Sequence, residues 1–222
     1  MNLKYELIPF CGYPILILET KELLNKSELT FLKNLKTTLH SKNNFRLTDS
    51  VNILNNTELR RIKDFIWKNF CNYLDYFLEI ENQFYMCNSW ATFQKKEDFH
   101  NSHNHSNAVF SSAFYVESDN DVLQFSVPKS KIQEGFNFDY NVKNYNVFNS
   151  STWDLKVKTG DMVFFPGELR HESAIHKSNT DRIMIGSSYF MKGEIGFADG
   201  YNTINISDAN EWWRTKKVYG IF

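Results

Sequence analysis

The period of the hydrophobic pattern changes near residue 82, and this change limits the folds that the chain can adopt. Before that point, residues 57–81 place apolar side chains at helical spacing along one stripe. After Gln83, short segments with β-favouring side chains alternate with polar connections. We therefore predict an α+β domain in which helices buttress a β-sandwich or barrel, with the aromatic residues of the stripe packed in the core.

The expected elements follow from the same patterns. An apolar run at residues 14–18 predicts a buried strand, residues 21–40 predict a first helix, and an Asn-rich loop precedes the long helix. Two N-terminal helices would thus be followed by about eight strands, of which the sequence marks residues 84–87, 89–93, 108–116, 122–127, 155–157, 162–165 and 183–191. Residues 128–153 are expected to form a long loop or hairpin that could cover the opening of a site. This segment is rich in Asn, Ser, Lys and Tyr.

The chain is expected to form one domain, because 222 residues suffice for a substantial core and no linker or repeat interrupts them. We divide it into an N-terminal strand and helices (1–82), a β core (83–191) and a C-terminal extension (192–222). The extension contains Trp212-Trp213, to which the sequence assigns no chemical role.

Composition excludes several classes of function. The net charge is −1 and no long basic run occurs, which argues against a broad surface for binding nucleic acid or membrane. A nucleic-acid substrate bound only at a local site is still compatible with the sequence. No stretch resembles a leader or a membrane span. Three widely spaced cysteines give no disulfide framework and favour the cytoplasm. Aromatic residues make up 16% of the chain, which favours a β-rich fold.

Three of the six histidines lie within residues 100–105. His103 and His105 are two positions apart, so on an extended strand both imidazoles would point to the same face. His171 follows a turn, a buried strand and a proline (160–166), and is the best candidate for a third ligand. Three imidazoles leave coordination positions open, as catalytic metals require. The alternative is a polar histidine tract with an unrelated core histidine; His40 and His176 are given no chemical role.

Arg182 begins an apolar strand eleven residues after His171. A guanidinium at such a position needs an anionic partner, because its desolvation is otherwise costly. That partner is either the carboxylate of a ligand, which the planar fork fits well, or a structural carboxylate such as Asp181 or Glu172.

Taken together, these residues resemble the iron(II)- and 2-oxoglutarate-dependent oxygenases of the double-stranded β-helix (jelly-roll) fold, most closely those of bacteria and phages. The resemblance spans roughly residues 8–191. It runs in order through the apolar N-terminal strand (14–18), the tryptophan-containing strand (89–93), a His-x-x-His-x-His segment leading into a strand (100–116), a Gly-to-Phe-Pro strand leading to a histidine (160–171), and the arginine at 182.

The resemblance implies a jelly-roll core in which His103, His105 and His171 bind iron. Arg182 would pair with the distal carboxylate of 2-oxoglutarate, and the Tyr115 hydroxyl would contact the same group. No catalytic residue is expected beyond these metal and co-substrate ligands.

Two positions depart from the family pattern. His105 stands where well-studied members have aspartate, which raises the charge of the site by one unit, and Met184 replaces a serine two positions after the arginine. Three further residues, His100, Trp90 and Gln94, are candidates for supporting a ligand or contacting substrate.

The function expected from this resemblance is that of a dioxygenase using Fe(II), 2-oxoglutarate and O2, which hydroxylates a small molecule or peptide and releases succinate and CO2. One alternative is a cupin-like three-histidine metalloenzyme without keto acid, although residues 106–110 lack the glutamate usual in such sites. Another is a non-enzymatic jelly-roll module with a structural metal. A homodimer is compatible with the sequence, which carries no signal for stoichiometry.

Overall fold

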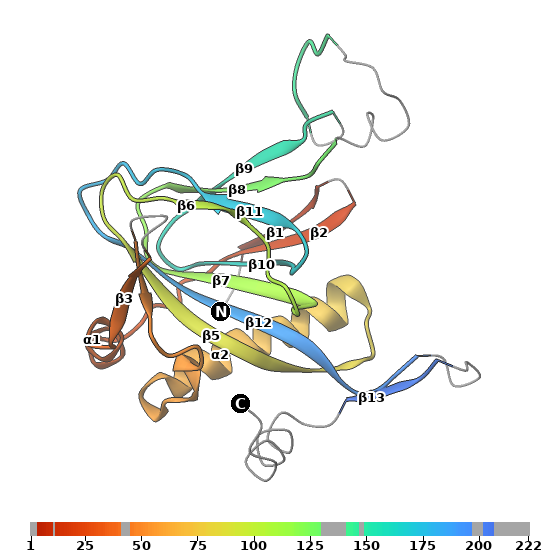
Figure 1. Ribbon diagram of the computed structural model, residues 1–222, viewed down its shortest axis with the longest axis horizontal. Helices are drawn as coiled ribbons and strands as arrows, with labels where there is room; N and C mark the ends of the chain where they lie inside the picture. Colours follow the sequence, from red (N-terminus) through yellow and green to blue (C-terminus); the bar gives the residue numbers. More distant parts are fainter. Residues whose placement is uncertain are drawn as a thin grey trace.

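Two antiparallel β-sheets face each other, and the main helix lies on the outer side of the larger one (Figure 1). The computed structural model describes residues 4–10, 12–40, 45–129, 141–146, 149–196 and 202–206. The larger sheet has nine strands in the order β1 (Lys4–Phe10), β2 (Tyr13–Glu19), β10 (Asp161–Pro166), β7 (Phe110–Glu117), β12 (Arg182–Ile195), β5 (Gln83–Gln94), β4 (Phe45–Thr48) and β3 (Thr37–His40), with β13 (Ile204–Ile206) paired to β12. The smaller sheet has the order β6 (His100–His103), β11 (Arg170–Ser173), β8 (Asp121–Ser126) and β9 (Thr152–Val157).

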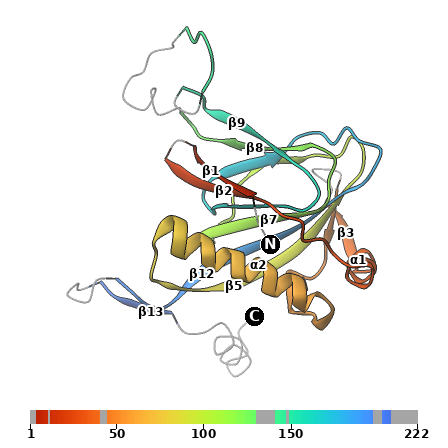
Figure 2. The same ribbon diagram turned by 180° about the vertical axis from the view of Figure 1, so that it is seen from behind.

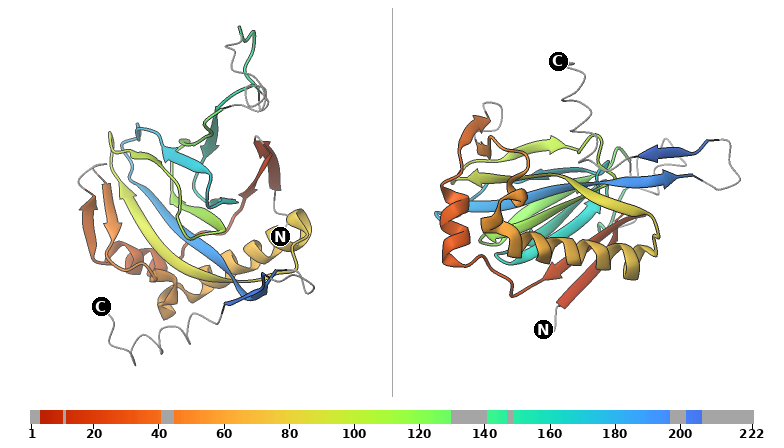
Figure 3. Two further views of the ribbon diagram at one scale, coloured as in Figure 1. Left: turned by 45° about the vertical axis from the view of Figure 1, so that its right-hand side comes forward. Right: turned by 90° about the horizontal axis from the view of Figure 1, so that it is seen from below.

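Helix α2 (Arg60–Asn72) runs across the outer face of the larger sheet (Figures 2 and 3). It follows two 3-10 turns, η1 (Ile53–Asn55) and η2 (Thr57–Leu59), and continues as a π-helical segment, η3 (Tyr73–Leu78). The ring of Phe70, on the buried side of α2, stacks on Tyr189 of β12 with 3.7 Å between ring centroids. The expected stripe therefore forms this interface, as its helical period requires.

Successive side chains on the central strands enter two different cores, one under the helices and one between the sheets. On β7, Phe114 and Val116 pack toward the helices, whereas Ala113 and Tyr115 face the smaller sheet. β2 and β10 alternate in the same way. Because both faces of these strands are covered, their sequences are continuously apolar. Successive side chains point to opposite faces, so only every second residue can reach a site between the sheets.

Several expected elements have different boundaries. The helix predicted over 21–40 is limited to α1 (Lys26–Lys33), because Thr37–His40 pair with Phe45–Thr48 as a hairpin at the edge of the larger sheet. The strand β4 of this hairpin and the turn η1 occupy what was predicted as the Asn-rich loop. The strand predicted at residues 14–18 lies within β2, whereas β1, which pairs with β2, was not predicted.

Two predictions fall on parts of the chain outside the described residues: half of the segment predicted over 128–153, namely 130–140 and 147–148, and the Trp212-Trp213 segment. The extension described as starting at 192 begins inside β12, which runs to Ile195. In the described ranges, no helix combines the length and apolar character that crossing a bilayer requires.

Candidate metal centre

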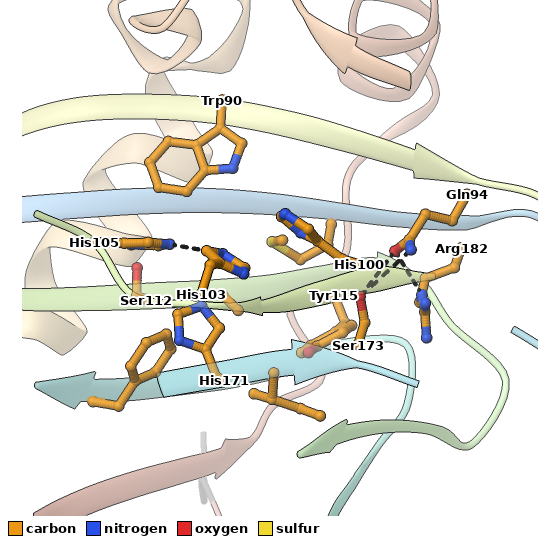
Figure 4. Close-up of a pocket in the computed structure, with 14 residues that line it drawn as sticks. Trp90, Gln94, His100, His103, His105, Ser112, Tyr115, His171, Ser173 and Arg182 are labelled. Atoms are coloured by element: carbon orange, nitrogen blue, oxygen red, sulfur yellow. Dashed lines mark hydrogen bonds between the residues drawn. The ribbon is translucent and has the colours of Figure 1, made fainter. Parts of the chain in front are cut away.

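Three histidines from two neighbouring segments converge between the sheets (Figure 4). His103 ends β6 and lies directly opposite His171 of β11 in the strand register. His105 lies in the connection to β7, where its backbone N–H donates to the Gly167 carbonyl at 2.9 Å. The prediction of a shared strand was therefore wrong for His105, and His171 sits within a strand. One ligand atom from each imidazole lies within 4.8 Å of the others.

Hydrogen bonds fix which nitrogen is free on two of the three rings, those of His103 and His171. Nδ1 of His103 lies 2.8 Å from the Asn101 carbonyl, and Nδ1 of His171 lies 2.9 Å from the Leu169 carbonyl. A carbonyl only accepts, so both Nδ1 atoms donate and both Nε2 lone pairs are available. Nδ1 of His105 lies 2.6 Å from the Ser111 hydroxyl. The rings are thus held by their outer nitrogens, as in protein metal sites.

The arrangement fits a divalent transition metal. Nε2 of His103 and Nε2 of His105 are 3.4 Å apart. Metal–nitrogen bonds of about 2.1 Å would place two ligand nitrogens about 3.0 to 3.4 Å apart for angles between about 90° and 109°. Without a metal the two nitrogens can share a hydrogen bond, because the Ser111 hydroxyl can donate to Nδ1 of His105 and leave the proton on its Nε2. Imidazole donors suit iron, nickel, copper and zinc, and this ligand set includes no carboxylate.

Burial keeps the four neighbouring imidazoles neutral. It lowers the pKa of His171 well below its ordinary value, with His103 and His105 adding to the effect. It also lowers the pKa of His105 to about 4 and of His100 to about 3, and lowers the pKa of His103. Because metal ligands must be unprotonated, protons compete weakly for these nitrogens near neutral pH.

Aromatic side chains form much of the wall around the histidines. The Trp90 indole meets the His105 ring edge-on at 5.1 Å between centroids, and Phe165 meets His171 at 4.7 Å. Gly186 lies opposite Trp90 in the strand pairing, where the absence of a side chain leaves space for the indole. The pocket as a whole is lined by Trp90, Gln94, His100, His103, His105, Ser112, Ala113, Tyr115, Leu123, Phe165, His171, Ser173, Arg182 and Met184.

His100 lies beside the cluster. Its ring stacks on His103 at 4.0 Å between centroids and touches Phe45 at 4.5 Å. Within the described residues, the set of donors close enough to share one ion contains His103, His105 and His171 and leaves out His100. This position agrees with support of a ligand or contact with substrate, and that role stays a prediction.

Arg182 lines the same pocket as the histidines, with Tyr115 and Ser173 also on its wall (Figure 4). It is 2% exposed and donates from Nε to Gln94 Oε1 at 2.9 Å, from Nη1 to Asp121 Oδ1 at 3.0 Å, and from Nη2 to the Ala174 carbonyl at 3.1 Å. Among the described side chains its carboxylate partner is Asp121, where the sequence suggested Asp181 or Glu172.

Tyr115 is fully enclosed, and burial raises the pKa of its hydroxyl while the charge of Arg182 opposes that shift. The hydroxyl is therefore protonated near neutral pH and can donate a hydrogen bond. Tyr115 and Arg182 thus present donors on one pocket wall, and their predicted contact with a co-substrate carboxylate remains a prediction.

Sequence reasoning missed the residues that hold the predicted site in place. Ser111 contacts His105, and Asp121 contacts Arg182. The signal for Ser111 was the Ser111-Ser112 pair at the start of an apolar strand, matched by Ser187-Ser188 in the neighbouring strand. A buried hydroxyl in such a strand needs a polar partner. Asp121 gives no comparable signal, because it follows two turn-forming polar residues.

Comparison with known proteins gives one family match. Residues 88–187 match the model of a family described as "Putative 2OG-Fe(II) oxygenase". No curated protein sequence has a significant match to this chain.

Solved structures with the same architecture include HygX from Streptomyces hygroscopicus, determined with nickel, 2-oxoglutarate and hygromycin B bound. It is 10% identical with a TM-score of 0.54, over 79% of this chain and 82% of that one. The non-heme alpha-ketoglutarate-dependent epimerase SnoN from nogalamycin biosynthesis is also 10% identical with a TM-score of 0.54, over 92% and 86% of the two chains. At this identity the likeness establishes the fold, and it confirms the predicted jelly-roll.

The segment that matches the family model contains the three converging histidines, and it also contains Tyr115 and Arg182. Over residues 88–187, a little under half of its length, this chain therefore resembles the 2OG-Fe(II) oxygenase family.

Proposed function

We propose that the protein is an iron(II)- and 2-oxoglutarate-dependent dioxygenase that hydroxylates a small molecule or a peptide. The observation that carries the proposal is the convergence of three neutral imidazoles in a pocket that also contains Arg182. When bound, iron(II) would chelate the keto acid end of 2-oxoglutarate and activate O2, so that one oxygen atom enters the substrate and the other enters succinate as CO2 leaves.

The metal would be held by Nε2 of His103, His105 and His171. Their outer nitrogens are already bonded to Asn101, Ser111 and Leu169, so the rings need little rearrangement on binding. Three protein ligands would leave other coordination positions of the metal open for the co-substrate.

Arg182 and Tyr115 would orient the distal carboxylate of 2-oxoglutarate. A guanidinium has five N–H groups, and Gln94, Asp121 and Ala174 take three of those on Arg182. Within the described part of the chain, two N–H groups of Arg182 are therefore left for a carboxylate. The protonated Tyr115 hydroxyl adds a donor from the adjacent strand.

The neutral ligand set has an electrostatic consequence. With His105 where a carboxylate is usual, the metal site carries one more positive charge. A dianionic co-substrate would then be attracted more strongly, and the apolar wall formed by Trp90, Leu123 and Phe165 would weaken the screening of that attraction by water.

The test is an anaerobic titration of iron(II)-loaded protein with 2-oxoglutarate, followed by succinate measurement after oxygen is admitted. We expect a visible charge-transfer band on chelation and succinate release. Arg182→Ala should weaken 2-oxoglutarate binding at least about tenfold, because a charge-assisted contact is lost. Arg46→Ala is the control, since Arg46 is an exposed arginine held by Thr37 on the β3–β4 hairpin.

Succinate release that is unchanged in Arg182→Ala would refute the assigned role of Arg182. Iron binding without any keto acid band would refute the proposed reaction and favour a three-histidine enzyme that uses no keto acid. If removing the metal unfolds the protein and no substrate supports oxygen consumption, the site is a structural metal site.

A further inference from the structure

Three ionisable side chains, those of Asp121, His176 and Arg182, are buried together. Asp121, His176 and Arg182 are 6%, 0% and 2% exposed. One oxygen of Asp121, Oδ1, lies 3.0 Å from Arg182 Nη1 and 2.6 Å from His176 Nδ1. Its other oxygen, Oδ2, accepts from the Ser118 hydroxyl at 2.7 Å. Asp121 is thus shared between two groups that can both be cations.

Both nitrogens of His176 face oxygen atoms that accept hydrogen bonds. Nδ1 faces the Asp121 carboxylate, and Nε2 lies 2.5 Å from the backbone carbonyl of Thr180. A neutral imidazole has only one N–H and could donate to only one of them. Two donated hydrogen bonds require the imidazolium form.

The backbone also holds His176 in place. Its N–H donates to the Asp98 carbonyl at 2.9 Å, and its own carbonyl accepts from the Glu97 N–H at 2.8 Å. These two bonds tie the loop between β11 and β12 to the connection between β5 and β6. The ring of His176 is consequently fixed against Asp121 from both its main chain and its side chain.

We propose that His176, held as an imidazolium, is a positioning residue that enables Arg182 to bind the distal carboxylate of the keto acid. This inference rests on the proposed function. Arg182 and Asp121 alone form a neutral pair, and an incoming carboxylate would meet the negative charge of Asp121 as well as the positive charge of Arg182. With His176 protonated, the three side chains carry two positive charges and one negative charge. That excess attracts an anion in a pocket of low dielectric constant.

The protonation state of His176 is measured directly by 15N NMR of the metal-free protein at pH 7, without co-substrate. We expect both ring nitrogens of His176 to resonate at the protonated position, with each correlated to a slowly exchanging proton. One nitrogen at the unprotonated position would overturn the proposal. This measurement needs neither metal nor keto acid, so its failure is distinct from failure of the proposed function.

The effect on binding is measured with two keto acids and iron(II)-loaded protein under anaerobic conditions. 2-Oxoglutarate carries the distal carboxylate, whereas 2-oxobutyrate has the same chelating end without it. In His176→Gln we expect the affinity for 2-oxoglutarate to fall about tenfold, as one charge is removed, and the affinity for 2-oxobutyrate to stay unchanged. An equal loss for both probes would mean that His176 is only structural and would overturn the proposal.

Asp121→Asn is the complementary variant, because it changes the negative charge of the cluster and His176→Gln changes the positive charge. It removes the negative charge, so Arg182 keeps its positive charge without a paired carboxylate, and the preference for 2-oxoglutarate over 2-oxobutyrate should persist. If Asp121→Asn loses this preference as His176→Gln does, the loss does not follow the charge of the cluster, and that outcome would also overturn the proposal. If the parent protein binds neither keto acid, the proposed function fails, and the NMR result still decides the state of His176.

Discussion

Replacing Gly186 by alanine would test how tightly the wall of the metal pocket is packed. A Cβ built at Gly186 lies 2.5 Å from Cε2 and 2.6 Å from Cζ2 of Trp90. Carbon atoms in contact normally lie about 3.5 to 4.0 Å apart, so the indole would have to move by about 1 Å. The indole contacts the His105 ring, with centroids 5.1 Å apart. The substitution should therefore displace His105, a proposed metal ligand that it does not touch.

Overpacking of this kind costs about 1–3 kcal/mol of the free energy of unfolding, which urea titration of the metal-free protein measures. Alanine also restricts the unfolded chain, which offsets about 0.4–1 kcal/mol of this cost. Disturbing the support of a metal ligand typically lowers metal affinity by about 10- to 100-fold, and we expect a loss in this range for Gly186→Ala by competitive metal titration.

The rescue variant is Gly186→Ala combined with Trp90→Phe, because a smaller ring makes room for the added methyl group. Trp90→Phe alone is the matched control. We expect the double variant to recover much of the metal affinity that Gly186→Ala loses. Unchanged stability and metal affinity in Gly186→Ala, or a double variant that loses as much as the two single variants added together, would refute the packing argument.

Three further predictions follow from other contacts. Ser111→Ala removes the hydroxyl 2.6 Å from Nδ1 of His105 and should lower metal affinity about tenfold in a competitive titration; an unchanged affinity would show that Ser111 does not support the ligand. Because burial lowers the pKa of His105 to about 4 and of His100 to about 3, the unfolded chain takes up protons near pH 6.5 that the folded protein excludes. Stability of the metal-free protein should thus be complete above pH 6.5 and fall toward pH 4, by about 1.4 kcal/mol per pH unit for each such histidine, and a flat profile in urea titrations would contradict this. Phe70→Ala should cost about 3–5 kcal/mol of unfolding free energy, because Phe70 is 0% exposed and stacks on Tyr189; a loss below about 1 kcal/mol would contradict that packing.

The parts of the fold that the sequence predicted depend on local pattern. The stripe that contains Phe70 repeats with the period of a helix, and it forms one against the larger sheet. The prediction over residues 21–40 failed because Thr37–His40 gain their hydrogen bonds from a partner strand that follows in the chain. Helical spacing in that segment could not reveal a competing interaction with Phe45–Thr48.

The candidate site also has features that the sequence predicted and features that only the fold decided. Spacing singled out His103 and His105, and the adjoining strand patterns singled out His171 and Arg182. The resemblance to a known family then supplied their expected roles. The sequence therefore determined which groups are available for chemistry. Only the tertiary structure decided how they are held: His171 meets His103 through strand register, and Asp121 reaches Arg182 from a different sheet. These contacts join residues 61 or more positions apart, and distances across such separations are fixed by the packing of the two sheets, which local spacing does not encode.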